Sequence, residues 1–223
     1  ATSDSEGDAR ILGYLDDHAY LIDALLTLYE ATFDYSYVDE ARALADRMIE
    51  RFWDPDWEVF YDTSLEHSRL LVRPRDVLDN ALPSGGASAA MALVRLSVYV
   101  GAPDYAAKAE ASMKSVLPHL EQSPAAVTSW LSAVDFLTAN RQEVIVVGDR
   151  EDPVVADMLR ETRGRFSPNT VLGGANKEPG EGEKSPLLMD RKLINGKATA
   201  YVCENYACKL PVTSAAELAE LLG

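Results

Sequence analysis

Residues 14–52 read YLDDHAYLIDALLTLYEATFDYSYVDEARALADRMIERF, and their apolar residues recur at the spacing of a helix. In the first half, one face carries Leu15, Ile22, Leu25, Leu26 and Tyr29. In the second half, the apolar stripe consists of Val38, Ala41, Ala45, Met48, Ile49 and Phe52. Ser36 with Asp39 three residues later has the pattern of a capping box at the start of the second helix. The stretch therefore predicts two helices joined by a short link, an αα-hairpin.

A second hairpin is predicted after an irregular stretch. Residues 53–73 lose the helical period and favour a short strand or an extended loop. Ser84 is a candidate N-cap for a helix that ends at Gly101, and residues 104–117 supply the return helix.

Ser123 followed by Pro124 marks the expected start of a fifth helix, because proline at the first helical position wastes no amide donor. We therefore expect residues 11–140 to form antiparallel αα-hairpins. Residues 1–10, rich in Ser, Asp, Glu and Gly, are expected to be a flexible tail.

The character of the sequence changes after residue 140. Residues 143–148 are an apolar run of strand length that ends at a glycine. Asp152 before Pro153 caps a helix that ends near Gly164, and residues 169–173 have the composition of a second strand. Strand, helix and strand in this order predict a βαβ unit with two parallel strands.

Residues 198–203 are a candidate third strand, and Ser214 with Glu217 caps a last helix. The Gly-, Glu- and Lys-rich residues 174–197 are expected to be a mobile loop. The sequence thus predicts a mainly α chain whose residues 141–223 form a small α/β unit.

Composition narrows the classes of function. The 223 residues contain 36 acidic and 21 basic side chains, a net charge of −15, which argues against binding to nucleic acid or to an anionic membrane. No apolar run approaches the ~20 residues of a membrane span, and the N-terminus does not resemble a signal peptide. We therefore expect a cytoplasmic protein.

Three stretches carry a resemblance to a known family. They are GYLDDHAY with the LIDALLTLYEAT that follows it (13–32), LLVRPRDVLDNALPSGGASAA (70–90) and AYVCENYACKLPVT (200–213). Together they resemble the C-terminal third of the thioredoxin-domain-containing family that includes spermatogenesis-associated protein 20 and bacterial homologues. The resemblance implies an (α/α) toroid of six hairpins, similar to glycosidases and N-acylglucosamine 2-epimerase, with a thioredoxin-like domain before it. This chain would then be a fragment that lacks that domain and about half of the toroid.

Candidate site residues gather at two expected helix starts. Asp16, Asp17 and His18 lie in the first turn of the first helix, where they either cap the helix or contact a ligand. Before the helix that begins at Ser84, charged side chains precede glycines that either expose amides to a ligand or allow close helix packing. The acid–base candidates are Asp17 and Asp79. The substrate-binding candidates are Asp16, His18, Arg73, Asp76, Ser84 and Gly85.

Cys203 and Cys208 are the two cysteines of the chain. Zinc would need two further ligands, and the three histidines are distant in sequence, so we expect no metal and no cofactor. A disulfide would require a tight turn through residues 204–207. The favoured interpretation is two free structural thiols in a reducing cytosol, and the alternative is a redox role toward the thioredoxin-like domain.

Three functions follow from these observations and from the resemblance. The whole protein would be a carbohydrate-active enzyme, epimerase- or glycosidase-like, that binds a sugar-like small molecule. Alternatively, it would be a non-catalytic ligand-binding or redox-partner module. The isolated fragment would be inactive and would self-associate through the uncovered face of its first hairpin, which carries Leu21, Leu25, Leu28, Tyr29 and Phe33.

Overall fold

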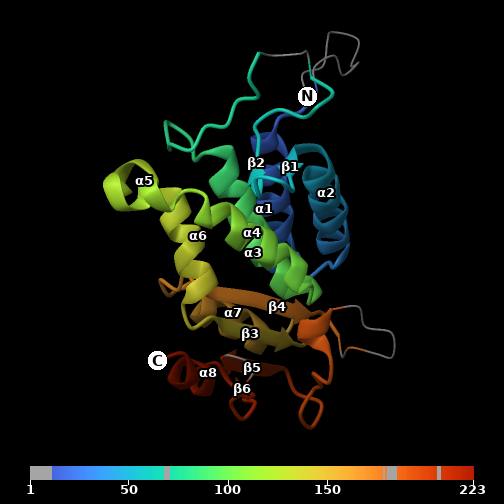
Figure 1. Ribbon diagram of the computed structural model, residues 1–223. Helices are drawn as coiled ribbons and strands as arrows, with labels where there is room; N and C mark the ends of the chain where they lie inside the picture. Colours follow the sequence, from blue (N-terminus) through green and yellow to red (C-terminus); the bar gives the residue numbers. More distant parts are fainter. Residues whose placement is uncertain (1–11, 68–70, 178, 180–184, 205–206) are drawn as a thin grey trace.

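The computed structural model describes residues 12–67, 71–177, 179, 185–204 and 207–223, so the predicted tail at 1–10 lies outside the described residues (Figure 1). The described chain is mainly α. Its helices are α1 (Leu15–Thr32), α2 (Ser36–Phe52), α3 (Gly85–Val100), α4 (Pro103–Lys114), α5 (Leu117–Gln122), α6 (Thr128–Thr138), α7 (Pro153–Arg163) and α8 (Ala215–Leu222). Its strands are β1 (Trp53–Asp54), β2 (Val59–Phe60), β3 (Gln142–Val147), β4 (Thr170–Ala175), β5 (Thr199–Glu204) and β6 (Ala207–Cys208). Short 3₁₀ turns occur at η1 (Pro124–Ala126) and η2 (Pro186–Leu188).

The first hairpin forms as predicted, but its link differs from the sequence expectation. Phe33 ends α1 in the left-handed conformation with φ 58°, and its amide donates to the carbonyl of Tyr29. Ser36 is the first residue of α2 rather than its cap, so the predicted capping box is wrong. The carboxylate of Asp34 accepts from the Ser36 amide at 3.0 Å and turns the chain into the helix instead.

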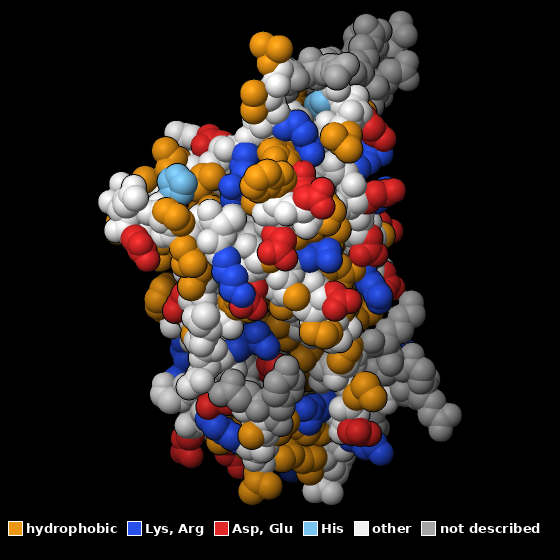
Figure 2. All heavy atoms as spheres, in the orientation of Figure 1, with side chains coloured by type: hydrophobic (Ala, Val, Ile, Leu, Met, Phe, Trp, Pro, Cys, Tyr) orange, Lys and Arg blue, Asp and Glu red, His pale blue; other side chains and the backbone are white. Residues whose placement is uncertain are grey.

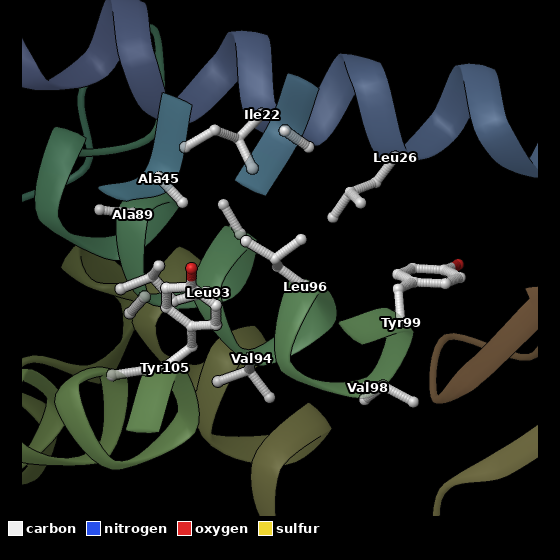
Figure 3. Close-up of a cluster of buried hydrophobic side chains, with 14 of the residues drawn as sticks. Ile22, Leu26, Ala45, Ala89, Leu93, Val94, Leu96, Val98, Tyr99 and Tyr105 are labelled. Carbon is white, nitrogen blue, oxygen red and sulfur yellow. The ribbon is translucent and has the colours of Figure 1, made fainter. Parts of the chain in front are cut away.

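Helix α3 lies at the centre of the helical half and is buried on several sides (Figure 3). Its bounds confirm the prediction, since the hydroxyl of Ser84 accepts from the Ala87 amide and Gly101 ends the helix at φ 62°. Small residues in its first turns let neighbours approach closely. A Cβ on Gly86 would lie 2.8 Å from the ring of Trp130 in α6, so that position requires glycine. Leu93 and Leu96 fill the core further along the helix.

The start of α6 corrects the sequence analysis. Pro124 opens only the 3₁₀ turn η1, and α6 begins at Thr128. The cap of α6 comes from a distant loop, because the carboxylate of Asp79 accepts from the Ser129 amide at 2.8 Å and from the Thr128 hydroxyl at 3.2 Å. The prediction from Ser123 and Pro124 that the helix starts there is therefore wrong, because the helix is capped four residues later by a side chain from another segment.

The second half is a four-stranded sheet in the order β4-β3-β5-β6. The pair β3 and β4 is parallel, as predicted from the βαβ order, and β5 and β6 run antiparallel to their neighbours. Alternate residues of β3 face opposite layers. Ile145 and Val147 join the core of the helical half, whereas Val144 and Val146 pack with α7 and α8. The sheet is thus the middle layer between the helical half and α7 with α8 (Figure 1).

The segment 174–197 is more ordered than its composition suggests. Strand β4 extends to Ala175, and η2 buries Leu187 and Leu188 in the core beside α3. The prediction of a mobile loop is therefore wrong for these parts, because two leucines fix the segment to the core. Residues 178 and 180–184 lie outside the described part of the chain.

The expected uncovered face of the first hairpin is smaller than predicted. Tyr29 and Phe33 are buried, Leu25 is half-buried, and only Leu21 and Leu28 are exposed. The sheet covers the end of α1, where the Phe33 ring lies so close to Gly174 of β4 that a Cβ on this glycine would clash with it. The prediction that Tyr29 and Phe33 are exposed is wrong, because the α/β half packs on them.

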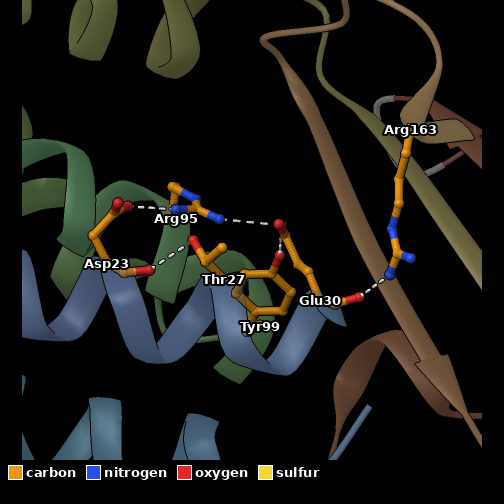
Figure 4. Close-up of polar contacts among 6 residues, drawn as sticks. All are labelled: Asp23, Thr27, Glu30, Arg95, Tyr99 and Arg163. Atoms are coloured by element: carbon orange, nitrogen blue, oxygen red, sulfur yellow. Dashed lines mark hydrogen bonds and ion pairs between the residues drawn. The ribbon is translucent and has the colours of Figure 1, made fainter. Parts of the chain in front are cut away.

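A partly buried ionic network joins α1, α3 and α7 (Figure 4). The guanidinium of Arg95 in α3 pairs with Asp23 and with Glu30 of α1, and the latter pair is 3.1 Å apart. Tyr99 donates its hydroxyl to Glu30, whose carbonyl accepts from Arg163 at 2.7 Å. Burial alone would lower the pKa of Arg95, but the charges of Tyr99, Glu30 and Asp23 outweigh burial and raise it, so the guanidinium keeps its charge across the usual pH range.

Replacing Arg95 with Ala should lower the free energy of unfolding by about 2–4 kcal/mol, because it leaves two carboxylates without their buried partner. The melting temperature should fall by roughly 5–12 °C in a chain of this size. The matched control is Arg160→Ala, which removes an exposed ion pair with Asp157 and should cost less than about 0.5 kcal/mol. Equal melting temperatures for the two variants would contradict this role of the network.

Candidate active site

A cleft of about 430 Å³ opens at the N-terminal ends of α1 and α3. Its floor is formed by the first turns of the two helices, and its rim by the segment 76–83 that leads into α3. It is lined by Tyr14, Asp16, Tyr20, Asp62, Asp76, Leu78, Asn80, Ala81, Leu82, Pro83, Ser84 and Gly85. The cleft lies at the two helix starts that carry the candidate residues, where ligand contact was one of the two alternatives.

Asp62 connects the cleft walls by its backbone and its side chain. Its carbonyl accepts from the amide of Leu15 at the start of α1, and its amide donates to the carbonyl of Pro74, both at 3.0 Å. One oxygen of its carboxylate accepts from the amide of Asp76 at 2.7 Å. The loop before α3 is therefore fixed to the start of α1 through this one residue.

Three carboxylates from three segments line the cleft, and no basic side chain is among its lining residues. Burial raises the pKa of Asp62, and the charges of Asp76 and Asp16 add to the shift. The hydrogen bond from the Asp76 amide and the charge of Arg75, which lies outside the lining, oppose it. Burial also raises the pKa of Tyr20, whose hydroxyl donates to the Pro83 carbonyl at 2.7 Å. Asp62 is thus the carboxyl of the cleft whose surroundings favour holding a proton.

Of the predicted substrate-binding residues, Asp16, Asp76, Ser84 and Gly85 line the cleft. The side chain of Ser84 is already engaged as the cap of α3. These four residues come from two segments about sixty residues apart, so the expectation that the two helix starts meet at one pocket agrees with the geometry.

Three other predicted residues lie outside the lining. Asp17 accepts from the Tyr14 amide at 2.9 Å and so closes the first turn of α1. The imidazole of His18 bonds through Nδ1 to the Tyr14 carbonyl at 2.8 Å. Arg73 donates to the Thr63 carbonyl at 2.6 Å. In each case a backbone group of the first turn of α1 or of the segment before α3 holds the side chain.

Asp79, predicted as a catalytic partner of Asp17, ties two helices together instead. One oxygen accepts from the Ser84 amide at 3.0 Å, and the other accepts from Ser129 and Thr128 at the start of α6. Burial alone would raise the pKa of this carboxyl, but the hydrogen bonds from Ser129 and Ser84 outweigh burial and lower it. A carboxylate held ionised by three donors is a structural cap and a poor proton donor.

The sequence analysis missed Asp62, Tyr14, Tyr20 and the rim residues of the segment 78–82. Asp62 lies in the stretch 53–73, which has no helical period and no motif that marks it. Its position follows from the short pair β1 and β2, which returns the chain to the start of α1. No local pattern in the sequence could have identified it.

The two cysteines form a disulfide, so the prediction of free thiols is wrong. Strands β5 and β6 pair antiparallel with Cys203 opposite Cys208, which brings their Cα atoms to 3.9 Å. Within the described residues, no group of three or more His, Cys, Asp or Glu side chains is arranged to hold a metal ion. No helix in the same residues combines the length and apolar character that a bilayer span needs.

Charge on the molecular surface is mixed. Lys and Arg side chains lie among acidic ones over the face shown in Figure 2 and form no continuous basic patch on it.

Comparison with known proteins finds homology over most of the chain. Spermatogenesis-associated protein 20 of Homo sapiens is 29% identical over 213 residues, which cover 94% of this chain and 27% of that protein. The Mus musculus protein of the same name is 28% identical over the same shares. An uncharacterized protein of Caenorhabditis elegans is 25% identical over 219 residues, 97% of this chain and 29% of that protein. No protein-family model matches the chain.

The chain is therefore homologous to spermatogenesis-associated protein 20 and spans about a quarter of the length of the curated relatives it matches.

Replacing Asp62 with Asn should stabilise the fold at pH 7 and leave it unchanged near pH 3. The raised pKa means that the folded state binds this proton more tightly than the unfolded state does. The wild-type fold therefore loses stability as the pH rises from the pKa in the unfolded chain, about 3.9, through the higher pKa in the folded chain. Because the side chain is partly solvated, the gain in melting temperature should be small, on the order of 1–3 °C. Melting curves measured at both pH values check this. A variant that is less stable than the wild type at pH 7 would show that the Asp62 carboxylate is structural.

Proposed function

We propose that the cleft at the starts of α1 and α3 binds a sugar-like small molecule and that the chain belongs to a carbohydrate-active protein, epimerase- or glycosidase-like. The observation that carries the proposal is the convergence of Asp16, Asp62 and Asp76 on one cleft beside Tyr14 and Tyr20. Carboxylates accept hydrogen bonds from hydroxyl groups, and aromatic rings offer an apolar face to the C–H surface of a sugar.

The electrostatics favour a neutral ligand. Two helix N-termini open on the cleft and would by themselves favour an anion. Three carboxylates line the cleft, and no basic side chain is among its lining residues. Arg75, outside the lining, offsets part of the charge of Asp62, and the negative charge that remains exceeds the half charge of a helix end. A neutral polyhydroxylated molecule satisfies the acceptors without that repulsion.

The acids of the cleft differ in ways that suit proton transfer. Asp62 holds a proton more readily than an ordinary carboxyl, which suits a general acid. Asp16 and Asp76 face the same space and are the candidates for the base. Glycoside hydrolysis and proton transfer at a sugar carbon both use one group as an acid and another as a base.

We extend the proposal to the longer protein by the family resemblance. The antiparallel hairpins α1–α2 and α3–α4 are compatible with part of a six-hairpin toroid, with a thioredoxin-like domain elsewhere in a cytoplasmic protein. In that arrangement this chain alone binds the sugar and does not turn it over. Leu21 and Leu28 remain exposed on α1, and self-association of the chain would use this face.

The alternative is a non-catalytic module that binds the same ligand or serves as a redox partner. The disulfide between Cys203 and Cys208 supports the second form of this alternative, because a redox partner needs a pair of cysteines that can be oxidised. The two candidates differ in turnover by the full-length protein, which only the enzyme shows.

Titration of the chain with neutral hexoses and N-acetylhexosamines, followed by saturation-transfer NMR, should detect binding, and the corresponding sugar phosphates should bind more weakly. Asp16→Asn and Asp62→Asn should each weaken binding about tenfold, the value of one charge-assisted hydrogen bond. The matched control is Asp17→Asn, which removes the adjacent carboxylate outside the cleft and should bind as the wild type does. Absence of binding by every neutral sugar, or equal effects of Asp16→Asn and Asp17→Asn, would refute the proposed site.

A further inference from the structure

The disulfide lies at the open edge of the sheet, far along the chain from the cleft described above. Strand β6 is the outermost strand beside β5, and it has only two residues. Cys203 in β5 is 1% exposed, whereas Cys208 in β6 is exposed. The two sulfurs therefore differ in access to solvent, and a reagent can approach Cys208 first.

One cation contacts both sulfurs. Nη2 of Arg191 lies 3.3 Å from Sγ of Cys203 and 3.2 Å from Sγ of Cys208. The guanidinium is held over the ring of Tyr201 at 4.9 Å, and its buried Nε has no hydrogen-bond partner in the described chain. The sulfur of a disulfide is a weak hydrogen-bond acceptor, so Nη2 of Arg191 makes only weak hydrogen bonds while the two cysteines are oxidised. A thiolate in the same place would accept a charge-assisted hydrogen bond.

The other charged side chains near the two sulfurs lie close to side chains of opposite charge. Glu143 of β3 lies directly across from Cys203 in the strand register, and its Oε1 is 3.9 Å from Nε of Arg141. Burial raises the pKa of Glu143, and the charges of Arg141 and Arg191 oppose this shift.

On the β6 side, Lys209 pairs with Glu204 at 3.2 Å, so these two charges offset each other. Arg191 is therefore the cation that faces the sulfurs directly, and Glu143 is the nearby group that can hold a proton.

The disulfide also lines a cleft of about 580 Å³. Arg141, Glu143 and Arg191 lie on its sheet side with both cysteines. The residues that α3, α4 and α6 contribute, all within the described chain, are uncharged, among them Val94, Val98, Ala106 and Leu137. A cleft that leads from an apolar wall to a disulfide beside an arginine can receive a molecule that carries thiols.

A purely structural role explains the disulfide poorly. The bond spans a sequence separation of five residues, and short loops gain the least from cross-linking. Strand β5 is already held along its six residues by β3. As a structural link, the bond would therefore hold only the two residues of β6 in place. This role does not explain why Arg191 contacts both sulfurs or why the bond lines a cleft.

We infer that Cys203 and Cys208 form a redox-active pair that accepts two electrons from a dithiol bound in this cleft, with Arg191 stabilising the thiolate that leaves. A thiolate of the dithiol attacks Sγ of the exposed Cys208, the bond between Cys203 and Cys208 breaks, and Cys203 leaves as a thiolate beside Arg191. The second thiolate of the dithiol then attacks the mixed disulfide and releases Cys208. The dithiol loses two electrons and two protons as it becomes a disulfide. Cys208 takes up one of these protons, Cys203 stays a thiolate beside Arg191, and the second proton passes to the solvent.

The test is the pH dependence of alkylation by iodoacetamide after reduction with dithiothreitol, read by mass spectrometry for each cysteine. We expect Cys203 to react with a midpoint about one to two pH units below the ordinary thiol value of about 8.5. Arg191→Gln should raise this midpoint by on the order of one unit, and Arg191→Lys should restore part of the shift. The matched control Arg160→Gln removes an exposed arginine on α7 and should leave the midpoint unchanged.

A second measurement uses glutathione disulfide as the probe. After reduction, Cys203→Ser should form a stable mixed disulfide at the exposed Cys208, and Cys208→Ser should form much less at the buried Cys203. An ordinary midpoint for both thiols in the wild-type chain would overturn the inference, and this result needs no variant to fold. A low midpoint that Arg191→Gln does not move would overturn the role of Arg191. Neither outcome bears on sugar binding at the other cleft.

Discussion

The burial of α3 between α1, α4, α6 and the sheet is the constraint on which the rest of the structure depends. The one basic side chain of α3, Arg95, is partly buried against α1 and pairs there with Asp23 and Glu30. The N-terminal end of α3 opens on the acidic cleft. Near its C-terminal end, Val94, Val98 and Gly101 line the second cleft, beside the disulfide.

Two aspartates near that open end illustrate how surroundings assign different roles to the same side chain. Asp79 receives hydrogen bonds from the starts of α3 and α6, which keep it ionised and fix the loop before α3. Asp62 is desolvated among other acids and receives a single amide hydrogen bond from the described chain, so its charge is disfavoured. The first arrangement stabilises the fold, whereas the second disfavours the charged form of the carboxyl.

The helix ends that could be predicted from the sequence depend on residues within four positions of one another. The caps at Ser84, Asp152 and Ser214 and the glycine after α3 were located because each motif contains both partners. The parallel strands followed from the order of strand, helix and strand. Two of the missed features join distant segments: the cap of α6 comes from Asp79 about fifty residues away, and Asp62 reaches the cleft through a short strand pair. The disulfide was missed because it depends on the antiparallel pairing of β5 with the two-residue strand β6.

The central claim is that the acidic cleft at the starts of α1 and α3 is a binding site for a neutral saccharide. A crystal structure of the chain soaked with the sugar that binds best in solution tests this claim most directly. The account predicts one sugar between Tyr14 and Tyr20, with its hydroxyl groups at hydrogen-bond distance from the carboxylates of Asp16, Asp62 and Asp76. A sugar bound elsewhere while this cleft holds only water would contradict the account.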